Sequence, residues 1–200
     1  MSCYACYDTG NGPVCQRRQL HVSTPPPQVR LLASLLAGIK ERENRHMNYE
    51  IVNRDVSTIA GLSARTNNQS PDMGNVIGGL WKHFYEDGIY ASIPNKKTSK
   101  ALGIYTDYAD DEKGDYTAMV ACEVSEPGSI PQGAVIHTIP AGRYAKFIVK
   151  GDMHQAVAGF WQQLWEMDLP RSFVCDFEEY QNSSMDEAEI HIYIGLKEEK

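Results

Sequence analysis

The sequence predicts an α+β fold: two tandem, pseudo-symmetric strand–helix–strand–strand units that form one antiparallel sheet with two helices on one face. Two observations predict this architecture. Two amphipathic helical segments share one apolar pattern, and the second follows the first at a distance of 80 residues. Each helix is also followed by two strand-like segments. An internal repeat of this kind outweighs single elements when a fold class is assigned.

The first unit is expected to open with a strand within residues 49–65. A helix follows over residues 76–85, where apolar residues recur at helical spacing and form one stripe. Gly88 can end this helix in a left-handed conformation. Two strands are then expected, at 101–108 and 116–124. On the last strand, alternate residues share a face: Tyr116, Ala118, Val120 and Cys122.

The second unit is expected to repeat this order. Its helix follows Asp152 and Gln155, which have the spacing of a capping box. Its apolar stripe includes Trp161 and Trp165, which we expect in the core, whereas Trp81 of the first helix fits a core and a pocket equally well. The strands of this unit are expected within 135–150, at 174–180 and at 189–196.

The repeat aligns the two units residue by residue. At an offset of 80, each helix position of the first unit has a similar partner in the second: Leu80 and Phe160, Trp81 and Trp161, Phe84 and Leu164, and before the helices Thr58-Ile59 and Thr138-Ile139. After the helices the offset falls to 72, because one loop is shorter. This alignment pairs Ala118 with Ile190, and it pairs Thr106 with Glu178. The symmetry is therefore broken at Glu178, where a packing repeat has no need of an acid.

The first 46 residues read differently from the rest. Cys3, Cys6, Cys15 and His21 can be drawn as a zinc site, but they lie in a short stretch before a triple proline, with no core to support them. We therefore expect residues 1–46 to be a disordered leader. A further hypothesis is that translation begins at Met47, because the codons for Lys40 to Glu43 are mostly purines and lie where a bacterial ribosome-binding tract would lie.

Charge and composition exclude several classes of function. Residues 47–200 carry 13 Lys or Arg and 23 Asp or Glu, a net charge of −10, which argues against binding a phosphate backbone. No apolar run approaches the roughly 18 residues that a membrane span needs, and no secretory signal is visible, so we expect a cytoplasmic protein. Residues 47–200 show no motif for a cofactor or metal, and none is expected.

The segment Asp176-Phe177-Glu178-Glu179-Tyr180 places two neighbouring acids on opposite faces of a strand. Parity alone leaves open which of them is turned inward. From residue 47 to 197 the chain resembles the GyrI-like small-molecule-binding family, the effector-binding domain that occurs alone or fused to AraC-type and MerR-type regulators. The resemblance rests on the order and spacing of LWKHFYEDGI, GDYTAMVACEV, TIPAGRYAKFIVKG, FWQQLWEMDL, DFEEY and AEIHIYIGL.

The resemblance implies a fold and a site. The family's fold is the same tandem arrangement, and residues 47–200 would form one such domain. In the family, the acid of an aromatic-Glu-x-aromatic segment points into a pocket, which selects Glu178. Aromatic residues surround that acid, and the matching positions here are Tyr116 and Trp81, to which we add Tyr180 and Tyr105.

Three functions fit these residues. The first is a stand-alone module that binds large aromatic or cationic small molecules in an acidic, aromatic-lined pocket. The second, known among stand-alone relatives, is hydrolysis of cyclopropane-bearing toxins, with Glu178 as general base and Tyr116 polarising the leaving group. The third is a gyrase-inhibitor-like contact with a protein. Residues 1–46 do not suit a helix-turn-helix domain, so we expect no direct DNA binding, and a protein partner would link the module to transcription.

Overall fold

The computed structural model describes residues 5–8, 13–16 and 47–198, which fall into two compact units divided after Asn44. In the first unit, β1 (Ala5–Asp8) and β2 (Pro13–Gln16) pair in antiparallel fashion. The disordered leader, the zinc site and translation from Met47 concern residues that lie mostly outside the described ranges, and they stay predictions.

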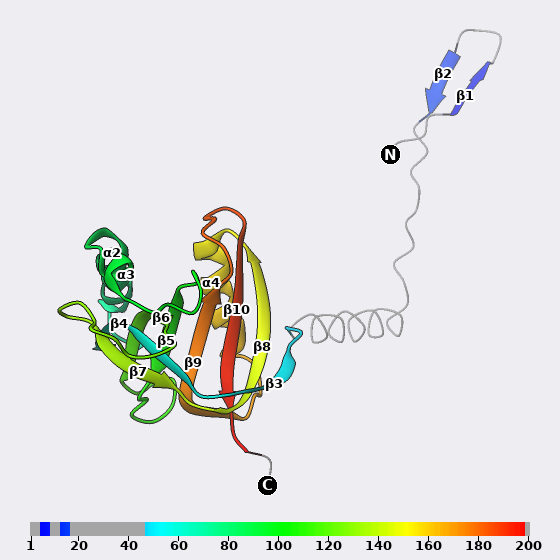
Figure 1. Ribbon diagram of the computed structural model, residues 1–200. Coiled ribbons are helices and arrows are strands. Elements are labelled where there is room, and N and C mark those ends of the chain that lie inside the picture. Colours follow the sequence, from blue (N-terminus) through cyan, green and yellow to red (C-terminus); the bar gives the residue numbers. More distant parts are fainter. Residues whose placement is uncertain (1–4, 9–12, 17–46, 199–200) are drawn as a thin grey trace. The chain divides into compact units, whose positions relative to one another are not determined.

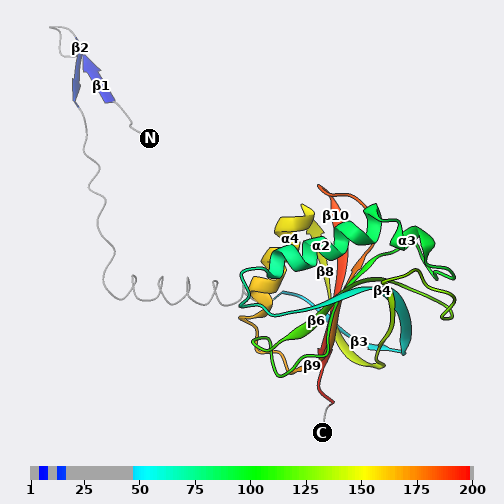
Figure 2. The ribbon, with the colours of Figure 1, turned by 90° about the vertical axis from the view of Figure 1, so that its left-hand side faces the viewer.

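The second unit contains one eight-stranded antiparallel sheet with two long helices on one side (Figures 1 and 2), which confirms the predicted α+β class. The strand order is β3-β8-β10-β9-β5-β6-β4-β7. The strands are β3 (Glu50–Arg54), β4 (Ser57–Thr66), β5 (Leu102–Thr106), β6 (Tyr116–Glu123), β7 (Val135–Ile139), β8 (Gly142–Gly151), β9 (Arg171–Tyr180) and β10 (Ala188–Leu196). The helices are α2 (Met73–Glu86), α3 (Ile89–Ser92) and α4 (Met153–Leu164). None of them has the length and apolarity that a membrane crossing requires.

The ends of the two long helices follow the predicted local signals. Gly88 adopts a left-handed conformation with φ of 73°, directly after α2 ends. At the start of α4, the Asp152 carboxylate accepts a hydrogen bond from the backbone N–H of Gln155 at 3.0 Å. These caps mark where α2 ends and where α4 begins.

The opening strand of each strand–helix–strand–strand repeat is divided into two, whereas the sequence predicts a single strand there. Residues 49–65 contain β3 and β4, and residues 135–150 contain β7 and β8. The first strand of each repeat pairs with a strand of the other repeat: β3 pairs with β8, and β7 pairs with β4. Thr58 and Thr138 therefore lie opposite each other in one ladder, and their alignment as equivalent positions was wrong. The exchange of β3 and β7, together with the central β5–β9 ladder, joins the two strand–helix–strand–strand repeats into a single sheet.

Strand bounds and register together define a pseudo-two-fold axis. The bounds of β3 and β7 differ by 85 residues throughout, as do those of β4 and β8. The ladders β4–β6 and β8–β10 then set an offset of 72 for β6 and β10, as predicted. The ladders β5–β6 and β9–β10 set an offset of 75 for β5 and β9, so Glu178 corresponds to Gly103 and not to Thr106. Gly103 and Glu178 lie directly opposite each other, and the axis passes between them.

Both faces of the sheet are buried. On the face without helices, Phe177 packs with Ile104, Met119 and Tyr193, and its side chain has no exposed surface. On the helix face, α2 covers β6 through Phe84, and α4 covers β10 through Phe160. A strand buried on both sides can hold neighbouring residues of opposite parity inside. Phe177 therefore lies in the core while Glu178 is buried under the helices, with 1% of its surface exposed.

Candidate functional site

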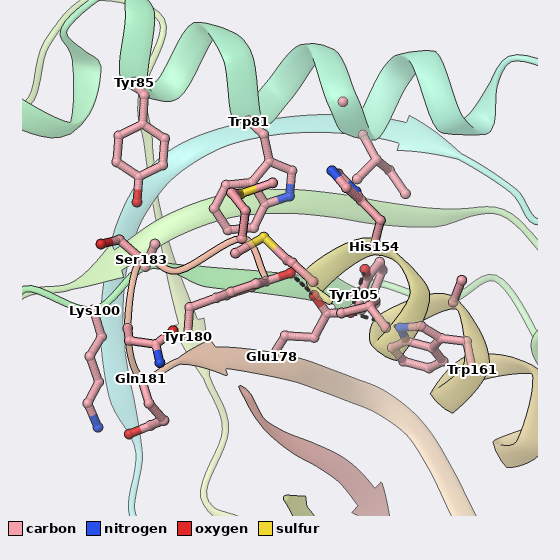
Figure 3. A pocket seen from close by; sticks show the side chains of 18 of the residues that line it. Trp81, Tyr85, Lys100, Tyr105, His154, Trp161, Glu178, Tyr180, Gln181 and Ser183 are labelled. Carbon is pink, nitrogen blue, oxygen red and sulfur yellow. Dashed lines mark hydrogen bonds between the residues drawn. The ribbon is translucent and has the colours of Figure 1, made fainter. Parts of the chain in front are cut away.

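A cavity of about 1000 Å³ lies between α2, α4 and the strands β5 and β9 (Figure 3). This volume is at the upper end of the roughly 300–1000 Å³ typical of small-molecule sites. The helices line it with Met73, Ile77, Trp81, Tyr85, Met153, His154, Val157 and Trp161. The sheet contributes Tyr105, Glu178 and Tyr180, and the rim includes Ser99, Lys100, Gln181, Asn182, Ser183 and Met185.

Three ring donors hold the Glu178 carboxylate. The Tyr180 hydroxyl donates a hydrogen bond to Oε2 at 2.7 Å, and the Tyr105 hydroxyl donates to Oε1 at 3.0 Å. The Trp161 Nε1–H also donates to Oε1, at 2.8 Å. Among the described residues, no Lys, Arg or His forms an ion pair with Glu178. All three donors are neutral groups, so no described cation offsets the charge that Glu178 carries when it is ionised.

Burial determines the protonation behaviour of this cluster. Loss of water raises the pKa of Glu178 above its usual value, and the hydrogen bonds from Tyr180, Trp161 and Tyr105 only partly reverse this. The same burial, together with the nearby carboxylate, raises the pKa of Tyr105 and Tyr180 well above normal. The tyrosines therefore stay protonated and serve as donors, and the carboxyl group is the one member that titrates at lower pH.

The rings around the carboxylate form two similar edge-to-face pairs. The ring centroids of Trp81 and Tyr180 lie 4.9 Å apart with an interplanar angle of 73°. Those of Trp161 and Tyr105 lie 5.0 Å apart with an angle of 77°. Each pair joins a helix ring to a strand ring and has the separation that aromatic pairs prefer.

Gly103 makes room for this arrangement. A Cβ atom at this position would lie 3.0 Å from Oε2 of Glu178 and 3.4 Å from Cζ2 of Trp81. The missing side chain thus lets the carboxylate and the indole approach the backbone of β5 closely.

The comparisons with known proteins identify the family of the chain. The model of the Cass2 family, described as integron-associated effector binding protein, matches residues 50–196. The chain belongs to this family. The match confirms the predicted GyrI-like effector-binding domain and its fold.

The matches to YobU, VCH_CASS2 and SAV2435 cover almost the whole length of those proteins. The chain is 28% identical over 154 residues to YobU, a putative transcriptional regulator of Bacillus subtilis strain 168, spanning 74% of this chain and 96% of YobU. The crystal structure of the integron cassette protein VCH_CASS2 of Vibrio cholerae is 25% identical, with a TM-score of 0.61, and covers 74% of this chain and 95% of that one. SAV2435, solved with bound tetraphenylphosphonium, is 19% identical with a TM-score of 0.64, over 76% and 94% of the two chains, which shows a shared fold.

Four of the five residues nominated from the sequence line the cavity of this domain: Glu178, Trp81, Tyr180 and Tyr105. Tyr116 does not. It is buried beside Tyr105, with ring centroids 5.8 Å apart, and its hydroxyl donates to Oδ1 of Asn68 at 2.9 Å. Burial raises its pKa to about 12, so it stays protonated there. A hydrolytic role for Tyr116 needs its hydroxyl in the cavity, and the structure directs that hydroxyl elsewhere.

Two tryptophans differ from expectation. Trp161 was expected in the core, but it lines the cavity and donates to Glu178. Trp165 was also expected in the core, but 49% of its surface is exposed, and it lies just beyond the end of α4 at Leu164. The repeat carried the signal for Trp161, since its counterpart Trp81 had been nominated for the pocket.

Glu179, the other acid of the segment, lies on the opposite face of β9. Burial raises its pKa, but hydrogen bonds from Gln181 and Lys100 outweigh that effect and lower the pKa overall. The Lys100 Nζ lies 3.1 Å from Oε2 of Glu179. The lysine at the rim of the cavity is therefore already paired, and it does not neutralise Glu178.

Other chemistry finds little support in residues 47–198. No three His, Cys, Asp or Glu side chains of the described residues come together as a metal site requires. Burial raises the pKa of the Cys122 thiol to about 11 and raises that of Cys175 further. Both thiols therefore behave as small apolar groups and not as nucleophiles.

Proposed function

We propose that this effector-binding domain binds lipophilic aromatic cations in its cavity, with Glu178 as the counter-charge. One observation carries the proposal: a carboxyl group lies buried at the base of an aromatic cavity with three ring donors, and it has no cationic partner within residues 47–198. Burying a charge without a partner is costly, and a structure keeps such a group when a bound charge offsets the cost.

The aromatic rings lie between the Glu178 carboxylate and a ligand in the cavity, and the carboxylate polarises them. Because only 1% of Glu178 is exposed, a ligand meets Tyr105, Tyr180 and Trp161 before it meets the oxygens. A ring that donates a hydrogen bond to an anion is polarised, and its face becomes more negative. A cation over such a face gains about 0.5–2 kcal/mol per ring. The cavity also offers apolar walls on α2 and α4, which favour a ligand with aromatic groups over a small ion.

Two relatives support this proposal. SAV2435, which shares the fold, binds tetraphenylphosphonium, a cation enclosed by four phenyl groups. YobU, which matches over nearly its full length, is a putative transcriptional regulator. We therefore propose that ligand binding by this domain is linked to transcription through a protein partner.

Calorimetric titration of the full chain tests the proposal with two ions of matched shape. Tetraphenylphosphonium and tetraphenylborate carry the same four phenyl groups and opposite charges. We expect the wild type to bind the cation and not the anion, and Glu178→Gln to lose at least tenfold in affinity for the cation, which equals about 1.4 kcal/mol.

A thermal unfolding assay gives an independent readout, since ligand at 100 times its Kd adds about 2.7 kcal/mol to the free energy of unfolding. Equal binding of both ions, or unchanged affinity in Glu178→Gln, would show that the carboxylate is not the counter-charge.

A further inference from the structure

The cavity is built from two pseudo-equivalent halves. The offset of 80 relates Trp81 to Trp161 on the helices, and the offset of 75 relates Tyr105 to Tyr180 on the strands. The pseudo-two-fold axis therefore exchanges the pair Trp81–Tyr180 with the pair Trp161–Tyr105. Their centroid distances of 4.9 and 5.0 Å, and their angles of 73° and 77°, agree with this relation.

The equivalence extends along the helix walls of the cavity. Both members of each helix pair line the cavity at the offset of 80: Met73 and Met153, Gly74 and His154, Ile77 and Val157, Gly78 and Ala158. A ligand group placed against α2 thus finds similar surroundings on the other side of the axis, against α4.

One acid serves both halves. Glu178 lies at the axis, opposite Gly103, and each of its oxygens accepts from the tyrosine of one half: Oε2 from Tyr180 and Oε1 from Tyr105. The two indoles differ. The Trp161 Nε1–H donates to Oε1, whereas the Trp81 Nε1–H has no hydrogen-bond partner among the described residues. The Trp81 half is therefore the one that can be altered without removing a donor from the acid.

We infer that the ligand spans the pseudo-two-fold axis, with its single positive charge near Glu178 and one aromatic group against each Trp–Tyr pair. This inference rests on the proposed function and adds the ligand's shape. The preferred class is a monocation whose charged atom carries at least two aromatic groups. A dication is disfavoured, because the axis holds one carboxylate.

Phosphonium ions with increasing numbers of phenyl groups test this shape at constant charge. Trimethylphenylphosphonium has one phenyl group, dimethyldiphenylphosphonium two, and methyltriphenylphosphonium three. Calorimetry on the full chain should show the largest gain in affinity between one and two phenyl groups. We expect this step to be about tenfold or more, because the second ring fills the second aromatic pair.

The variant Trp81→Leu removes one half and leaves all three donors to Glu178. It should abolish the step between one and two phenyl groups. The one-phenyl ion can still use the other half, so it should lose only about twofold, the statistical cost of losing one of two equivalent orientations. Trp165→Leu is the matched control, since Trp165 does not line the cavity, and it should change neither affinity.

Three outcomes separate this inference from the proposed function. Failure of tetraphenylphosphonium to bind would overturn both. Binding that depends on Glu178 but rises evenly from one to three phenyl groups would overturn the inference alone, as would equal losses for the one-phenyl and two-phenyl ions in Trp81→Leu. A direct check on the wild type uses nuclear Overhauser contacts from dimethyldiphenylphosphonium: contacts to both indoles support the spanning geometry, and contacts to a single indole contradict it.

Discussion

Two buried acids lie two residues apart on the same face of β9, and they are stabilised in different ways. Asp176 forms an ion pair with the Arg171 guanidinium, 2.7 Å from Oδ2, and accepts further hydrogen bonds from the Tyr108 hydroxyl and the Gly195 backbone N–H. Glu178 accepts three hydrogen bonds from rings and has no cationic partner among the described residues. The charge of Asp176 is balanced by an ion pair, whereas Glu178 has only neutral hydrogen-bond donors around it in the described part of the chain.

The residues that lie opposite the two acids on the neighbouring strand also differ. On β5, Tyr105 lies opposite Asp176, and Gly103 lies opposite Glu178. Asp176 does not line the cavity, whereas Glu178 does. Burial alone therefore does not distinguish the two acids. The distinguishing features are the missing counter-charge and the contact with a cavity.

The largest expected effect comes from removing the balanced acid. Asp176→Ala leaves the buried Arg171 guanidinium without its partner and should reduce the free energy of unfolding by about 3–5 kcal/mol. Urea unfolding of the full chain at pH 7 measures this. Glu178→Gln serves as the contrast, because Glu178 has no cationic partner within residues 47–198. Similar losses in the two variants would show that the two acids have the same structural role.

Sequence reasoning found the acid and missed part of its surroundings. The helical stripes predicted α2 and α4, but on α4 the neighbours Phe160 and Trp161 share one broad stripe. Phe160 packs in the core and Trp161 faces the cavity. Periodicity cannot separate two adjacent apolar residues on one stripe, because both lie within the buried arc of the helix.

The exchange of β3 and β7 between the two repeats could not be predicted from the sequence either. A break of two residues separates β3 from β4, and another separates β7 from β8. Residues on both sides of each break have strand character, so the pattern reads as one strand in each case. Which strand then pairs across units depends on register, and register is set by long-range contacts. For the same reason the offset of 75, which relates Gly103 to Glu178, came from the ladders and not from residue similarity.

A smaller effect of opposite sign is expected at the unbalanced acid. Folding raises the pKa of Glu178, so this group favours the folded state at low pH, and that contribution is lost as the pH rises through the folded-state pKa. Glu178→Gln avoids the loss. At pH 8 the variant should exceed the wild type in unfolding free energy, by about 1.4 kcal/mol for each unit by which folding raises this pKa.

Below about pH 4, near the ordinary pKa of glutamate, the two proteins should become equal. Urea unfolding at pH 4 and pH 8 measures the difference between them. The other titrating groups are common to both proteins, so this difference isolates Glu178. A wild type as stable as the variant at pH 8 would mean that the carboxylate is already balanced within the fold.

The smallest expected effect concerns the glycine across the axis. In Gly103→Ala, the new Cβ would lie 3.0 Å from Oε2 of Glu178, so the carboxylate must shift by a few tenths of an ångström, and 3.4 Å from Trp81, which leaves the indole in close contact. We expect the affinity for tetraphenylphosphonium to fall about threefold, roughly 0.6 kcal/mol. Gly79→Ala is the matched control, because a Cβ on that helix glycine meets nothing within 4 Å, and helix propensity should make it neutral or stabilising. Equal affinities in the two variants, measured by calorimetry, would mean that the acid and the indole can move apart without loss, and the asymmetry between Gly103 and Glu178 would then have no role in binding.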